Sequence, residues 1–135
     1  MITLMTQVEL AIAHRLPKHG GKCRRLHGHN YVLKIEVSGL MSSSTGMIAD
    51  FSVLKNLVHS AIEDRYDHKT ILNRWDTKYV KLPAADVVRI NVQPTAEELV
   101  RIFAEEMREV LTPLDLAIVS LELSETSGCS ARYMV

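Results

Sequence analysis

Alternation of apolar and polar residues predicts two neighbouring strands in the first 40 residues. Every second side chain from residue 2 to 12 is apolar or threonine, and His14 continues that phase. A second alternating run begins at His27 and His29 and continues as an apolar face to Val37. Residues i and i+2 of a strand share a face, whereas on a helix they diverge by about 200°. The two histidines of the second run are therefore expected to project together at the start of a buried face.

Helical periodicity indicates two helices in the middle of the chain. The first can be capped by Asp50 or by Ser52, and its apolar stripe runs out near Tyr66. The second begins at Thr95–Glu98, which matches the Thr-x-x-Glu capping box, and is ended by Pro113. Both apolar stripes are interpreted as core.

Alternation returns near the C-terminus and indicates a further strand. Its apolar phase is formed by Ala117, Val119, Leu121 and Leu123, and Glu125 falls in the same phase. Residues 69–94 are irregular, with a possible short strand at 86–91. The expected fold is one α+β domain over residues 1–135, with an antiparallel four-stranded sheet and both helices on one face.

Pairing of the first two strands predicts a cluster of imidazoles. In an antiparallel hairpin the end of one strand lies beside the start of the next, so His14 would approach His27 and His29. Three neutral imidazoles form a stable but open metal site. The connecting loop, Arg15–Arg25, would hold Cys23 nearby. The alternative for these histidines is hydrogen bonding within the fold, without a metal.

Composition restricts the classes of partner. The 135 residues contain 16 basic and 16 acidic side chains, which gives no indication of nucleic acid or an anionic membrane as partner. No apolar run approaches the roughly 20 residues of a membrane span, and the first residues do not resemble a signal peptide. Two cysteines, Cys23 and Cys129, do not form a disulfide scaffold. A cytoplasmic protein with reduced cysteines is expected.

Several short motifs, in order, resemble the 6-pyruvoyltetrahydropterin synthase / 6-carboxytetrahydropterin synthase (QueD) family over nearly the whole chain. The segment between residues 71 and 92 is longer than in compact bacterial members. The motifs are Ala13-His14-Arg15-Leu16, Cys23 to His29, Gly46 to Phe51 with Lys55, Asp67-His68-Lys69, Pro94-Thr95-Ala96-Glu97 and Glu125-Thr126.

The resemblance implies a role for each candidate residue. The zinc ligands would be His14, His27 and His29. Cys23 would be the catalytic thiolate, assisted by Asp67 and His68. On the substrate side, Glu125 would anchor the pterin ring and Thr95 would also bind the substrate.

The resemblance also implies a substrate and an assembly. The substrate would be 7,8-dihydroneopterin triphosphate, and the fold a tunnelling fold whose subunits close a barrel as a trimer or a dimer of trimers. Three residues between Cys23 and His27 favour the carboxy-forming branch over the pyruvoyl-forming branch. A non-catalytic zinc- or pterin-binding module is the alternative from another class. The triphosphate would suit the loop cations, with no choice among Arg15, Lys18, Lys22 and Arg24.

Overall fold

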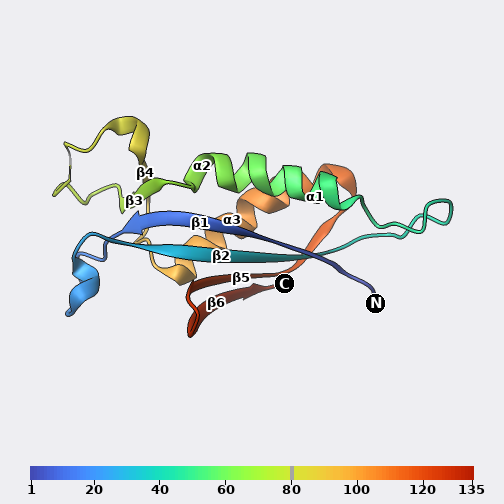
Figure 1. Cartoon of the computed structure of the whole chain (residues 1–135), viewed down its shortest axis with the longest axis horizontal. Helices are drawn as coiled ribbons and strands as arrows, with labels where there is room; N and C mark the ends of the chain where they lie inside the picture. Colours follow the sequence, from blue (N-terminus) through green and yellow to red (C-terminus); the bar gives the residue numbers. More distant parts are fainter. Residues whose placement is uncertain (80) are drawn as a thin grey trace.

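The computed structural model describes residues 1–79 and 81–135, and its centre is a six-stranded mixed sheet (Figure 1). The strand order is β4-β3-β1-β2-β5-β6. The strands are β1 (Leu4–His14), β2 (His27–Ser38), β3 (Lys69–Asn73), β4 (Val87–Ile90), β5 (Ala117–Thr126) and β6 (Cys129–Met134). Neighbours β1–β2, β2–β5 and β5–β6 pair antiparallel, whereas β1–β3 and β3–β4 pair parallel.

The α+β class is confirmed, but the expected antiparallel four-stranded sheet is wrong. The two parallel strands, β3 and β4, contain five and four residues, which is too short for a clear alternation. The last strand, β6, is mostly exposed, with Ala131 and Tyr133 partly buried against the core. It pairs with β5 across a short turn, whereas β3 depends on pairing with β1, which is distant along the chain.

The helices cover one face of this sheet. The first helical run consists of α1 (Phe51–Val58), a π-helical turn (His59–Glu63) and α2 (Asp64–Tyr66). It begins at Asp50, whose carboxylate accepts from the Ser52 backbone N–H at 2.7 Å. Figure 1 shows α1 and α2 lying along β1, with α3 (Ala96–Leu111) beside them. No helix in residues 1–79 and 81–135 is long and apolar enough to cross a membrane.

The core lies between this face and the helices. It includes Leu10, Leu33 and Phe103, each fully buried, and His14 at the end of β1 is only 1% exposed. The predicted N-terminus of the second helix is confirmed, because the Thr95 hydroxyl accepts from the Glu98 N–H at 3.2 Å. The cap places the turn before α3 directly opposite the end of β1.

A β-bulge changes the expected phase of the C-terminal strand. The pairing of β2 with β5 passes from Glu36↔Ser120 to Val37↔Ile118, so Val119 is an extra residue. Ile118 is therefore buried and Ala117 exposed, the reverse of the sequence expectation. After the bulge the phase is as expected, since Leu121 and Leu123 are fully buried.

Candidate metal centre and active site

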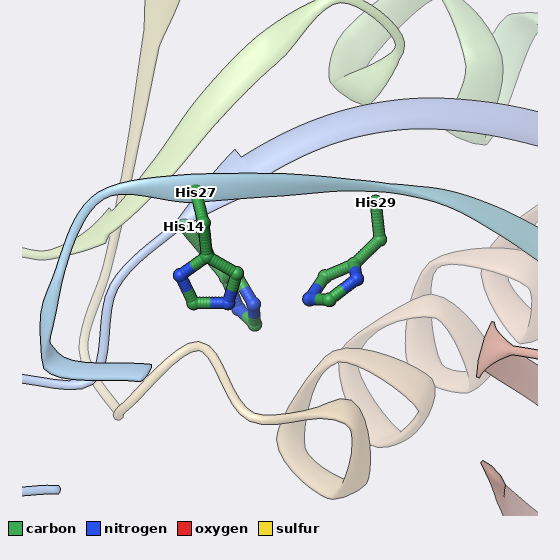
Figure 2. Close-up of side chains that lie close together, drawn as sticks. All are labelled: His14, His27 and His29. Carbon is green, nitrogen blue, oxygen red and sulfur yellow. The ribbon is translucent and has the colours of Figure 1, made fainter. Parts of the chain in front are cut away.

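Three imidazoles meet at the end of the β1–β2 hairpin. The register pairs His14 with His27 and Ile12 with His29, which puts all three rings on the core face. Figure 2 shows them projecting from the same side of the two strands toward the turn before α3. One ligand nitrogen from each ring lies within 4.8 Å of the others. The predicted convergence of the three histidines is confirmed.

Backbone carbonyls orient two of these rings. His14 Nδ1 lies 2.7 Å from the Pro94 carbonyl oxygen, and His27 Nδ1 lies 2.7 Å from that of Arg25. A carbonyl only accepts, so each Nδ1 carries the hydrogen and each Nε2 has its lone pair available for a metal. The two backbone contacts therefore select the tautomer that a metal ligand needs.

The surroundings of His29 and the burial of His14 also favour a bound metal ion. His29 Nε2 is buried without a hydrogen-bond partner in the described chain, which is costly for a polar atom. Burial, the largest influence, lowers the pKa of His14 and keeps that ring neutral. Three converging imidazoles with one unsatisfied buried nitrogen fit a divalent ion such as zinc or another metal that accepts imidazole ligands.

A carboxylate and a phenol border the triad. Glu125 Oε1 lies 3.4 Å from the Nε2 atoms of both His14 and His29. The hydroxyl of Tyr31 donates to the same oxygen at 3.1 Å. Burial and the neighbouring Glu125 charge raise the pKa of Tyr31, so this hydroxyl keeps its proton. Sequence reasoning assigned Tyr31 to the core only; its i+2 spacing from His29 was the available signal.

Cys23 lies in the loop that joins the two histidine-bearing strands. It occupies a short 3-10 turn, Lys22–Arg24, and is partly buried. Its carbonyl accepts from the Leu16 N–H at 2.8 Å, which ties the two arms of the loop together. Cys23 is among the groups that raise the pKa of Tyr31, so its thiol lies near the border of the triad.

Asp67 and His68 lie elsewhere on the chain, at the end of α2. Asp67 Oδ1 accepts from the Ala11 N–H at 2.8 Å, and the His68 N–H donates to the Ala11 carbonyl at 2.7 Å. His68 has a left-handed backbone, φ 60°, and its side chain is 82% exposed. Its Nε2 is 3.6 Å from Asp67 Oδ2. The two residues are therefore neighbours in space as well as in sequence.

His68 lines a hollow on the two strands that carry the triad. Ala11, Ala13 and Asn30, which alternate along the strands with the core-facing residues, line this hollow together with His29 of the triad. Within residues 1–79 and 81–135, no hydrogen bond or ion pair joins Cys23 to Asp67 or His68. The described polar contacts of one copy therefore do not link Cys23 to the other two candidates.

Two hollows meet at Thr95. The smaller, about 280 Å³, is lined by Thr95, Glu125 and the N-terminal turn of α3, including Glu97. The larger, about 1040 Å³, lies where β1, β3 and β4 end, and its cations are Arg15, Lys18 and Lys78. Sequence reasoning included Glu97 only as part of the Pro94–Glu97 motif, and it missed Lys78, whose placement depends on the segment after β3.

Comparison with known proteins decides the family. The family model for 6-pyruvoyl tetrahydropterin synthase matches residues 3–135. The chain belongs to this family. A 6-carboxy-5,6,7,8-tetrahydropterin synthase of Rickettsia typhi is 30% identical over 134 residues, covering 96% of this chain and 97% of the relative. The enzyme of the same name from Haemophilus influenzae is 30% identical over 142 residues, covering 98% and 99%.

Solved structures agree with the tetrahydropterin synthase fold. A protein of Wolinella succinogenes described as uncharacterized superposes with a TM-score of 0.84 at 19% identity, over 98% of this chain and 97% of that one. The 6-pyruvoyl tetrahydropterin synthase of Plasmodium vivax gives 0.76 at 21% identity, over 98% of both chains. These identities support the fold alone.

Proposed function

We propose that this chain is a 6-carboxytetrahydropterin synthase. The reaction converts 7,8-dihydroneopterin triphosphate and one water into 6-carboxytetrahydropterin, acetaldehyde and triphosphate. The observation that carries the proposal is the triad of His14, His27 and His29, whose ligand nitrogens lie within 4.8 Å of one another, in a chain related over nearly its full length to enzymes of that name. The three-residue spacing from Cys23 to His27 favours the same branch.

We propose zinc as the ion held by His14, His27 and His29. A three-imidazole site leaves one coordination position for substrate, and bound zinc supplies Lewis acidity to the substrate's side-chain oxygens. The carbonyls of Pro94 and Arg25 hold two rings in the ligating tautomer. The triad is thus arranged before a metal arrives.

Proton transfer is assigned to Cys23 together with Asp67 and His68. A carbon–carbon cleavage of this kind needs a base for the substrate side chain and a second group to return or move protons. Cys23 lies on the triad's own loop and is proposed as the base. Asp67 orients His68, which is proposed to move the second proton.

The ends of the substrate are assigned to the two hollows. Glu125 and Thr95 are proposed to bind the pterin, since a carboxylate accepts two hydrogen bonds from a guanidine-like N–H edge. The triphosphate is proposed to lie in the larger hollow, near Lys18 and Lys78. Neither lysine forms an ion pair within residues 1–79 and 81–135, whereas Arg15 is already paired with Asp76 at 2.6 Å.

We also propose that residues 1–135 are one domain and that its copies form a barrel as a trimer or dimer of trimers. The separation of Cys23 from Asp67 and His68 supports a site completed by a neighbouring copy. A cytoplasmic location is proposed on the two free cysteines, one of them exposed.

The decisive experiment is an anaerobic incubation of zinc-loaded protein with 7,8-dihydroneopterin triphosphate. Mass analysis of the pterin and a trap for acetaldehyde report the products. The proposal expects 6-carboxytetrahydropterin and acetaldehyde in equal amounts. Pyruvoyltetrahydropterin without acetaldehyde would assign the chain to the other branch of the family. No product from zinc-bound protein would indicate a binding module.

A further inference from the structure

A buried phenol holds the carboxylate that borders the triad. Tyr31 is fully buried, and its hydroxyl donates to Glu125 Oε1 at 3.1 Å. Within residues 1–79 and 81–135, this is the one hydrogen-bond donor to the Glu125 carboxylate. The same oxygen lies 3.4 Å from two imidazole nitrogens, those of His14 and His29. The Tyr31 hydroxyl also lies 3.4 Å from both ring nitrogens of His14, so the phenol links the carboxylate to the triad.

The backbone around Glu125 leaves this position poorly determined by the sheet. Pairing of β5 with β6 shifts between Ser124↔Ser130 and Thr126↔Cys129, so Glu125 is an extra residue at a bulge. A bulge changes the direction in which the side chain of its extra residue points. Here the extra residue, Glu125, lies one position beyond Val32↔Ser124, the last pair between β2 and β5. Continuing that antiparallel register places Tyr31 opposite Glu125. The Tyr31 hydroxyl thus restrains the Glu125 side chain, whose position the pairing of the strands does not fix.

We infer that Tyr31 is a positioning residue that acts through Glu125. It holds Oε1 at the border of the triad and so aims the carboxylate into the hollow shared with Thr95. Tyr31 does not touch the substrate in this scheme. The inference rests on the proposed function, because it assumes that the Glu125 carboxylate accepts hydrogen bonds from the N–H edge of a pterin.

The test is Tyr31→Phe, which keeps the buried ring and removes only the hydroxyl. Loss of a hydrogen bond to a charged group is expected to raise the KM for 7,8-dihydroneopterin triphosphate, and the Kd for neopterin, by about tenfold or more. The kcat and the bound zinc are expected to change little. The variant loses the same binding free energy in the ground state and in the transition state, so the barrier from bound substrate is unchanged.

Tyr66→Phe is the matched control. Tyr66 is also buried, and its hydroxyl donates to a carboxylate, Glu106, at 2.6 Å, on the helical side of the core. Its removal is expected to lower thermal stability without changing KM. Equal KM changes in both variants would show that the effect of Tyr31 is only structural and would overturn the inference.

A double-mutant cycle separates action through Glu125 from any other role. If Tyr31 works through the carboxylate, Tyr31→Phe combined with Glu125→Gln should bind neopterin no worse than Glu125→Gln alone. Additive losses would overturn the inference. Should Tyr31→Phe not fold, Glu125→Asp breaks the same contact with the ring intact and should give the same rise in Kd.

Failure of the inference can be distinguished from failure of the proposed function. A wild-type protein without turnover contradicts the proposed function. An active wild-type protein whose Tyr31→Phe variant has unchanged KM and neopterin Kd contradicts only the role of Tyr31.

Discussion

Cys23 and His27 lie four residues apart, yet the structure gives them different surroundings. His27 Nδ1 is engaged by the Arg25 carbonyl and its Nε2 is turned to the triad, which suits a permanent ligand. Cys23 lies on the preceding turn, partly buried, outside the cluster of ligand nitrogens. The two side chains should therefore separate in a metal assay.

His27→Ala is expected to lose both zinc and activity, because two imidazoles bind a divalent ion much less tightly than three. Cys23→Ala should keep a full complement of zinc while turnover falls about 10²–10⁴-fold, the usual effect of removing a base. Metal analysis after dialysis and the product assay measure the two properties. His19→Ala, on the same loop and exposed, is the control and should keep both. Zinc retained by His27→Ala, or lost by Cys23→Ala, would contradict these roles.

The elements show which parts of the fold can be predicted from local pattern. The long hairpin and its three histidines follow from period-two alternation, and the start of α3 follows from the Thr95 cap, so the triad was predictable. The parallel strands β3 and β4 were not, because each is too short to show a pattern and each depends on its neighbour, β3 on β1 and β4 on β3. The bulge at Val119 likewise depends on β2. The hydrogen bond from Tyr31 to Glu125 could not be predicted, since it depends on a second bulge.

The segment between β3 and β4 leads to a prediction about charge. Lys78 and, from the loop after β1, Lys18 line the larger hollow, whereas Lys22 and Arg24 are not among its lining residues. Lys18→Ala and Lys78→Ala should each raise the KM for the triphosphate substrate about three- to tenfold, with the effect weakening in high salt. Neopterin, which has no phosphate, should bind as before.

The control for this prediction is Lys22→Ala, measured with both ligands. Lys22 carries the same charge on the same loop as Lys18, outside the hollow. If Lys22→Ala alone raises the KM, the triphosphate lies against the Cys23 turn and the assignment to the larger hollow is wrong.

In the whole molecule, the proposed proton-transfer groups lie in two separate parts of the chain. Cys23 belongs to the hairpin end that carries the triad, while Asp67 and His68 are held against Ala11, and His68 lines a hollow beside β1 and β2. We propose that a second copy supplies one part, so that the three groups share one substrate. Closed symmetric assembly would repeat this contact at every interface.

Mixing two inactive variants tests this arrangement directly. Cys23→Ala retains Asp67 and His68, and His68→Ala retains Cys23, so a mixed ring has interfaces at which both intact groups meet. Each mixed trimer has one of its three interfaces intact, so doubly purified trimers should recover about a third of wild-type activity, and dimers of trimers about a quarter. Co-expression with two affinity tags, followed by the product assay on doubly purified protein, measures the recovery. Each variant assembled alone is the control and should stay inactive. Mixed assemblies without activity would mean that Cys23 and His68 work within one chain, through a rearrangement of the loop or of the end of α2.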